Sequence, residues 1–370
     1  MQNFIIKELV VSDIEAELVK IGFDIAYRAK AAEKFKYKTF KIFSLSLPQA
    51  NILKQTALSF GADCAVHREV LVNSVDNTNA ILGGSYSQLK KICNKLKLQP
   101  FNMKILADEI LSKLNFALME TKLVGVLNLT PDSFSDGGKY FSPDAALNQF
   151  VQLVEDGADV IDIGAESTRP GAIDVEPFEQ IKRLKLVLEN IPDIRIPISV
   201  DTRSSEVARY ALDSGASIIN DVSGMTYDAK IADVVASYDA TLILQHSTLN
   251  AKDRPAYDDV VEEVYLSLLN KKIKAQEKGV KKLILDVGIG FGKSKENNFE
   301  LLNRIEEFHT LGSPLMVGVS RKSFLGDFND IDSLDAMSLA CSYPLMQKGV
   351  EYLRVHNVKL HRQLLDSVIL

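Results

Sequence analysis

The chain has 370 residues, of which 46% are hydrophobic and 25% charged, and its net charge is −6. This length favours one large and one smaller domain, and the charge lacks the basic stripe of a nucleic-acid-binding protein. No apolar run reaches the roughly 18 residues of a membrane span. The first residues turn acidic too early for a secretion signal, and three scattered cysteines do not suggest a disulfide framework. We therefore expect a cytoplasmic protein with neither a membrane nor a nucleic-acid partner.

Residues 1–118 predict a small α/β domain. Segment 38–66 has the pattern strand, helix, strand, and segment 79–98 has the pattern strand, helix. Residues 1–115 carry 16 Lys and Arg against 11 Asp and Glu, a charge of +5, so the remainder carries −11. This part shows no cluster of catalytic residue types, and Asp63 and His67 are expected to be ordinary surface residues. We expect a structural or oligomer-modulating role for it.

From residue 119 onward, short β-branched runs alternate with amphipathic segments. Near-continuous apolar strands of this kind belong to parallel sheets covered by helices. Eight such units over roughly 250 residues predict a (β/α)8 TIM barrel, with an open doubly wound sheet as the competing fold. The eight runs are 123–128, 159–164, 196–201, 217–222, 241–246, 283–288, 315–320 and 351–356.

Polar residues gather at the ends of these runs, where a barrel places its functional side chains. Asp201, Asn220 and Asp286 end three different runs. Their carboxylate and amide groups suit a flat, nitrogen-rich heterocycle, because they can accept its ring N–H and amino protons. Either Asp alone could equally be the N-cap of the next helix, so the prediction depends on all three together.

A second set of strand-end residues is cationic: Arg169, Arg321, Lys322, Arg354 and His356. Those after the seventh and eighth runs lie where barrels most often bind phosphate, and a guanidinium binds phosphate with two hydrogen bonds. The alternative interpretation, a solvated pair on the surface, suits Arg321 better than Lys322. Arg354, flanked by strand residues, requires a buried anionic partner. The sequence thus predicts a pocket for a polar heterocycle with an anion at its mouth.

The glycine-rich stretch GIGFGKS at 288–294 does not predict a nucleotide site. A phosphate loop needs a glycine where Val287 stands, and the spacing does not match the dinucleotide fingerprint. A tight turn, or close approach of the backbone to a ligand, is the simpler interpretation.

The ordered motifs of residues 120–370 resemble those of the dihydropteroate synthases. They are NLTPDSFSDGG (128–138), AESTRPGA (165–172), SVDT, INDV, LDVGIGFGK, SRKS and RVH. That family joins p-aminobenzoate to 6-hydroxymethyl-7,8-dihydropterin diphosphate, releasing pyrophosphate and forming 7,8-dihydropteroate for folate. The resemblance also implies Mg²⁺, a homodimer and sensitivity to sulfonamides.

The resemblance implies a role for each matching residue. The pterin ring would be held by Asp201, Asn220, Asp286 and Lys322. The diphosphate would be held by Asn128, which also binds Mg²⁺, and by Arg354 and His356. The p-aminobenzoate site would be shaped by Phe134, Pro170, Phe291, Lys322 and Ser323, with Thr168, Arg169 and Pro170 on a second mobile loop. The stretch after the first barrel strand would be a lid whose Asp136 stabilises a cationic pterin methylene, and the catalytic residues would be Asp136, Lys322, Arg354 and His356.

Three positions depart from the family pattern. Val287 replaces a usual Pro, Gln245 a usual Met, and Asn357 a usual Asp. Three other functions stay open: a corrinoid methyltransferase that shares the pterin-binding barrel, a class I aldolase with Lys322 as Schiff-base nucleophile, and a non-catalytic pterin-binding protein.

Overall fold

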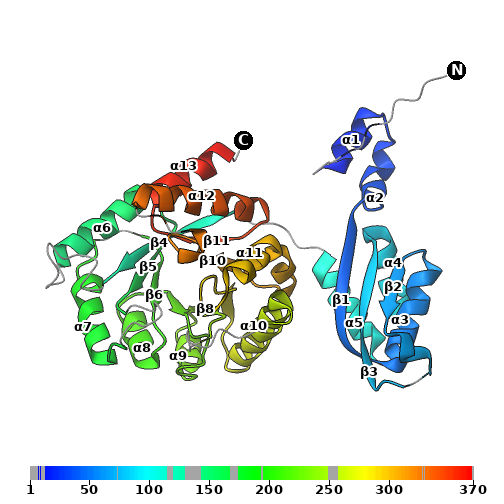
Figure 1. Cartoon of the computed structure of the whole chain (residues 1–370), viewed down its shortest axis with the longest axis horizontal. Helices are drawn as coiled ribbons and strands as arrows, with labels where there is room; N and C mark the ends of the chain where they lie inside the picture. Colours follow the sequence, from blue (N-terminus) through cyan, green and yellow to red (C-terminus); the bar gives the residue numbers. More distant parts are fainter. Residues whose placement is uncertain are drawn as a thin grey trace. The chain divides into compact units, whose positions relative to one another are not determined.

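The computed structural model describes residues 7, 9, 13–72, 74–114, 120–129, 143–166, 174–192, 195–248, 257–326, 328 and 330–368. The chain divides into two compact units, Met1–Phe116 and Ala117–Leu370 (Figure 1). No helix within these ranges is both long and apolar enough to cross a membrane.

The N-terminal unit is a three-stranded antiparallel sheet with helices. The sheet order is β1-β3-β2, and the predicted strand–helix–strand and strand–helix segments are confirmed, whereas α1, α2 and α5 were not predicted. Asp63 and His67 are exposed, as expected. The elements are α1 (Ile14–Lys20), η1 (Ile25–Tyr27), α2 (Arg28–Ala32), β1 (Tyr37–Ser46), α3 (Leu47–Ser59), β2 (Asp63–Val66), η2 (Arg68–Val72), β3 (Asn77–Ser85), α4 (Tyr86–Leu96) and α5 (Met103–Leu114).

Helices α3 and α4 begin in the same way. Ser46 with Gln49, and Ser85 with Gln88, form capping boxes in which each glutamine side chain accepts from the backbone N–H of its serine. Both helices contribute to a buried core of their own, which includes Leu53. The unit therefore has the local start signals and the separate core of an independent domain.

The second unit confirms the predicted (β/α)8 barrel and excludes the doubly wound sheet. Its strands close in the order β10-β11-β4-β5-β6-β7-β8-β9, and every pair is parallel. The strands are β4 (Lys122–Asn128), β5 (Val160–Gly164), β6 (Ile198–Asp201), β7 (Ile218–Asp221), β8 (Thr241–Gln245), β9 (Lys282–Asp286), β10 (Leu315–Val317) and β11 (Tyr352–Val355).

Helices surround these strands (Figure 1). They are α6 (Pro143–Glu155), α7 (Pro177–Leu188), α8 (Ser205–Asp213), α9 (Ile231–Ser237), α10 (Val260–Glu277), α11 (Lys295–Asn303), α12 (Ile331–Gln347) and α13 (Val358–Val368), with the short 3-10 helices η4 (Ile305–Leu311) and η5 (Ser323–Leu325).

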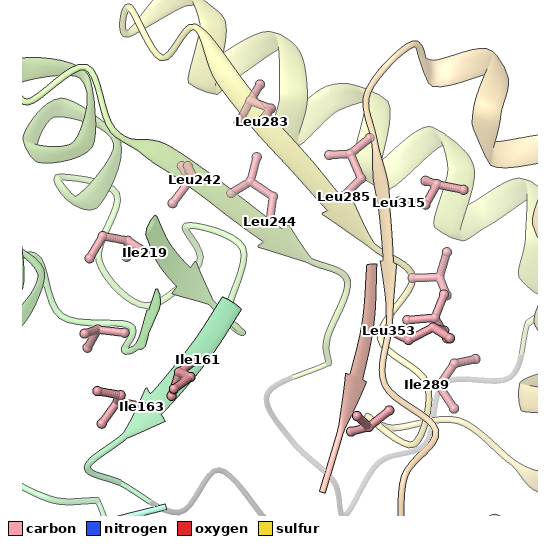
Figure 2. Packing of buried hydrophobic residues seen from close by; sticks show 14 of the residues in the cluster. Ile161, Ile163, Ile219, Leu242, Leu244, Leu283, Leu285, Ile289, Leu315 and Leu353 are labelled. Atoms are coloured by element: carbon pink, nitrogen blue, oxygen red, sulfur yellow. The ribbon is translucent and has the colours of Figure 1, made fainter. Parts of the chain in front are cut away.

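Alternation along each strand decides which side chains enter the barrel. Ile161 and Ile163 of β5, like Leu283 and Leu285 of β9, belong to the layer between strands and helices, part of which Figure 2 shows. The intervening residues, such as Ile284, form a separate inner cluster. Because side chains alternate with period two, the polar residue two positions after an inner apolar one also points into the barrel. Because all eight strands are parallel, the inward-pointing polar groups at their carboxyl ends lie at the same end of the barrel.

Candidate active site

Arg354 of β11 is bonded to two carboxylates from neighbouring strands. Its Nε donates to Asp162 Oδ2 at 2.6 Å, and its Nη2 donates to Asp201 Oδ2 at 3.1 Å. The carboxylates are buried, whereas the Arg354 side chain is 23% exposed. Arg354 thus has two anionic partners within the chain, while its binding of a ligand anion stays a prediction. These bonds use two of its five N–H donors, so the guanidinium can also bind a ligand.

Asp162 also links Arg354 to residues of β6 and β7. Its Oδ1 accepts from Ser199 Oγ at 2.5 Å, and its Oδ2 accepts from Asn220 Nδ2 at 3.0 Å. The carboxylate therefore fixes the orientation of both Arg354 and Asn220. Asp162 lies within the predicted run 159–164, to which the sequence analysis assigned no site residue. Its position two residues after the inner Val160 is a signal that could have identified it as one.

Two buried acceptor oxygens in this network lack a hydrogen-bond partner within the described part of the chain. They are Asp201 Oδ1 and Asn220 Oδ1. An unsatisfied buried acceptor costs about 1–3 kcal/mol, and the two residues are adjacent across the β6–β7 register. A ligand that presents N–H groups here would satisfy both. Asp201 does not cap the following helix; Ser204 does.

Asp286 is the third predicted ring-binding group, and it too is buried. Its Oδ1 accepts from the backbone N–H of Gly288 at 2.7 Å. Burial raises the pKa of the Asp286 carboxyl, while Lys322 in particular acts to lower it. Asp286 lies two residues after the inner Ile284, so it points into the same end of the barrel as Asp201 and Asn220.

Lys322 lies beside the turn that follows β9. Its Nζ donates to the carbonyl oxygen of Ile289 and is 4.7 Å from the centroid of the Phe291 ring. Burial lowers the pKa of Lys322 to about 8, with Asp286 acting in the opposite direction. Phe291 is half-buried and Ser323 is exposed. The structure therefore places Lys322 beside Phe291 and close enough to Asp286 for their charges to interact.

The remaining described site residues lie at the same end of the barrel. Asn128 is the last residue of β4 and pairs with Gly164 of β5, which in turn pairs with Asp201. His356 follows β11, and its Nδ1 lies 3.0 Å from Ser320 Oγ. Phe134, Asp136, Thr168, Arg169 and Pro170 lie outside the described residues.

Arg321 corrects one prediction. Its guanidinium makes two bonds to Asp335, at 2.7 and 2.9 Å, and its side chain is 31% exposed. It is therefore neither a solvated surface residue nor a group held ready for an anion. The backbone of Arg321 has a φ of 56°.

Asn357 donates to the same Asp335 carboxylate at 2.9 Å, so this departure from the family pattern supplies a donor where an Asp would repel Asp335.

The other two departures have separate consequences. Val287 is fully buried in the strand–helix layer, away from the pocket. Gln245 is the inward-facing end of β8, and its Nε2 donates to the carbonyl of Val222 at 3.4 Å. Of the two, only Gln245 is placed to affect the shape of the pocket.

The glycine-rich turn is a tight turn, as expected. Gly288, Gly290 and Gly292 have φ of 68°, 83° and 67°, values that side chains rarely adopt. A Cβ on Gly288 would lie 1.7 Å from the carbonyl oxygen of His246. The glycines therefore allow the backbones after β8 and β9 to approach closely.

Binding of a pterin ring should require ionised Asp201, so the affinity for the ring should depend on pH. Burial raises its pKa to about 7, opposed by Arg354 and reinforced by Asp162, Asp221 and Glu166. The affinity for a phosphate-free pterin should therefore rise several-fold between pH 6 and 7.5, because the ionised fraction of the carboxylate rises. Calorimetric titration across this range measures the effect. An Asp201→Asn variant with the same pH dependence would contradict the assignment.

Comparison with known proteins finds one matching family and similar dihydropteroate synthases. Residues 124–356 match the family described as "Pterin binding enzyme". A dihydropteroate synthase of Staphylococcus haemolyticus is 40% identical over 258 residues, which cover 68% of this chain and 95% of that protein. A solved dihydropteroate synthase of Xanthomonas albilineans, in complex with 7,8-dihydropteroate, has a TM-score of 0.62 and 35% identity, and covers 68% of this chain and 94% of its own.

A longer relative matches part of the N-terminal unit as well. A probable bifunctional folylpolyglutamate synthase/dihydropteroate synthase of Halobacterium salinarum is 38% identical over 331 residues. The match covers 84% of this chain, a share larger than the barrel unit alone, so it extends into Met1–Phe116. This chain spans 40% of the length of that relative.

Proposed function

The chain belongs to the pterin binding enzyme family, and on this basis we propose that it is a dihydropteroate synthase. It would condense 6-hydroxymethyl-7,8-dihydropterin diphosphate with p-aminobenzoate to give 7,8-dihydropteroate and pyrophosphate. The observation that carries the proposal is the pair of buried acceptors on Asp201 and Asn220 that have no hydrogen-bond partner among the described residues. Asp286 adds a third acceptor group at the same end of the barrel, and together they complement the N–H groups of a pterin ring.

In the proposed reaction, the ring sits between these acceptors and Lys322. Arg354 and His356 stabilise the diphosphate as it departs, since charge on the leaving group must be neutralised. The bonds that Arg354 donates to Asp162 and Asp201 hold the guanidinium in place before substrate binds, so little reorganisation is needed during the reaction. The amine of p-aminobenzoate then attacks the pterin methylene, with Phe291 and Ser323 lining its site. Asp136 is proposed to stabilise the positive charge at that carbon.

Asn128 fits the proposed Mg²⁺ in its chemistry. Mg²⁺ prefers oxygen ligands, and it usually combines one or two protein oxygens with substrate phosphates and water. Among the described residues, no group of three or more His, Cys, Asp or Glu could hold a metal by itself. The amide oxygen of Asn128, at the end of β4, is an oxygen ligand of this type. When bound, Mg²⁺ supplies neutralisation of the diphosphate charge.

Growth complementation tests the proposal. The chain should restore growth without added folate products to a bacterium that lacks its own dihydropteroate synthase, and a sulfonamide that competes with p-aminobenzoate should suppress that growth. Well-expressed, folded protein that fails to restore growth would count against the proposal.

The proposal also includes a cytoplasmic homodimer. The free thiols of Cys64, Cys93 and Cys341 are compatible with a reducing compartment.

One observation also favours the aldolase alternative. A Schiff-base lysine needs a lowered pKa, and that of Lys322 is lowered to about 8. Borohydride treatment with a carbonyl substrate would trap a covalent adduct at Lys322 if that chemistry occurs. An adduct would replace the synthase proposal, whereas its absence with intact pterin binding would leave the synthase proposal as it stands.

We propose that the N-terminal unit is a structural or oligomer-modulating extension. Deleting residues 1–115 should leave turnover within about tenfold of the full chain, because a relative about as long as the barrel alone carries the synthase name. Steady-state kinetics of both forms, with sedimentation analysis of their oligomeric state, measure this. A truncated chain that folds but has no activity would show that the extension takes part in catalysis.

A further inference from the structure

Lys293 is a buried lysine that the proposed reaction does not use. Only 4% of the residue is exposed, and its Nζ lies within hydrogen-bond distance of three backbone carbonyl oxygens. These belong to Gly288 at 2.8 Å, Phe291 at 3.2 Å and His246 at 3.3 Å. In its protonated form the amine has three donors, one for each of these carbonyls. Lys293 is thus occupied with backbone and has no donor left for a substrate.

The three carbonyls come from two segments that must lie unusually close. His246 follows β8, whereas Gly288 and Phe291 belong to the turn after β9. At Gly288 the second segment approaches the carbonyl of His246 so closely that only glycine fits. Carbonyl oxygens that converge in this way repel one another unless a donor lies between them. Lys293 supplies that donor and joins the two segments.

The turn is held from a second direction by Lys322, which donates to Ile289 and lies over the Phe291 ring. The charged groups that act on Lys293 are Asp286, Lys322 and Lys271. Lys271 of α10, which is half-buried, donates to the carbonyl of Gln245 at 2.9 Å, so two lysines bond to the backbone at the end of β8. The turn that carries Phe291 is therefore fixed between Lys293 and Lys322.

We propose that Lys293 is a positioning residue that holds the 288–292 turn against the end of β8 and thereby sets the place of Phe291 in the p-aminobenzoate site. This inference rests on the proposed function, because Phe291 is assigned to that site. Asp286 lies on the strand before the turn, paired through the sheet and bonded to the N–H of Gly288. Lys293 should therefore affect p-aminobenzoate more than the pterin.

A Lys293→Met variant tests the inference. The KM for p-aminobenzoate should rise by about tenfold or more, the factor expected when a charged hydrogen-bond donor is lost. The kcat should change less, and the affinity for the phosphate-free pterin should stay within about threefold of wild type. A merely structural role would reduce both affinities together. If Lys293→Met does not fold, Lys293→Gln, which keeps two N–H donors, is measured in the same way.

Lys348→Met is the matched control. Lys348 also donates to two backbone carbonyls, those of Leu302 and Asn303 at 3.1 and 2.7 Å, and it follows α12, which precedes β11 at the other end of the barrel. The Lys348→Met variant should leave the affinities for p-aminobenzoate and for the phosphate-free pterin unchanged. An unchanged KM for p-aminobenzoate in folded Lys293→Met, or equal losses for both ligands, would overturn the inference.

Hydrogen exchange separates this inference from the proposed function. The peptide 287–292 should exchange faster in Lys293→Met than in wild type, whether or not the wild-type chain has turnover. Unchanged exchange would refute the positioning role by itself. Wild-type protein without turnover, but with the expected difference in exchange, would refute the proposed function and leave the structural part of the inference intact.

Discussion

Replacing Arg354 by Met is expected to abolish turnover and to destabilise the fold. The change leaves the buried Asp162 and Asp201 carboxylates without their cation, and breaking a buried ion pair from one side costs about 3–5 kcal/mol. It also removes the group proposed to stabilise the departing diphosphate, so kcat/KM should fall by at least about a thousandfold. Urea denaturation and steady-state kinetics on the same preparation measure both effects.

Arg362→Met provides a close control for this prediction. The Nη2 of Arg362 is 2.6 Å from Asp159 Oδ2, and its side chain is 26% exposed, values near those of Arg354. Asp159 precedes β5, so this pair lies at the opposite end of the barrel. Arg362→Met should lower the free energy of unfolding and keep its turnover. Turnover of Arg354→Met within tenfold of wild type would remove Arg354 from the site.

Replacing Lys322 by Ala should have a large effect on catalysis with little effect on stability. Removing a charged donor beside the ring site should lower kcat/KM by about a hundredfold. The pKa of Lys322 is about 8 in the folded chain, below the ordinary 10.5, so protonation of Lys322 disfavours folding at pH 7. Deleting the side chain removes that penalty. The free energy of unfolding should therefore stay within about 1 kcal/mol of wild type.

Lys272→Ala is the control for Lys322. The Nζ of Lys272 also donates to a backbone carbonyl, that of Leu311, which precedes β10 (Leu315–Val317) and so lies at the opposite end of that strand from the site. Denaturation curves at pH 7 and pterin titrations should show normal binding for this variant and weak binding for Lys322→Ala. Unchanged kinetics in a folded Lys322→Ala protein would show that the lysine is not a site residue.

The barrel could be predicted because its strands are encoded locally. Each of the eight runs is short, apolar and β-branched, and each is followed by an amphipathic segment, so strand number and order follow from the chain itself. Because the strands are parallel, Asp201, Asn220 and Asp286, which end three of the runs, lie at the same end of the barrel. Three N-terminal helices were missed, although Asp13, which accepts from the N–H groups of Glu15 and Ala16, is an ordinary cap signal for α1.

The connections within the site could not be predicted, because they depend on register and closure. Asp162 meets Arg354 only because β11, β4 and β5 are neighbours in a closed sheet. Arg321, whose backbone has a positive φ, is bonded to Asp335, 14 positions further along the chain. The contact of Lys293 with His246 joins residues 47 positions apart in sequence. Such contacts are set by the packed barrel, whereas the motifs show only that the residues are present.

The central claim is tested most directly by following the products when purified protein is mixed with dihydropterin diphosphate and Mg²⁺, with and without p-aminobenzoate. With p-aminobenzoate present, we predict sustained release of pyrophosphate and one 7,8-dihydropteroate for each pyrophosphate released. Pterin binding without any dihydropteroate, by protein that is folded and retains Asp201, Asn220 and Asp286, would contradict the account and indicate a non-catalytic pterin-binding protein.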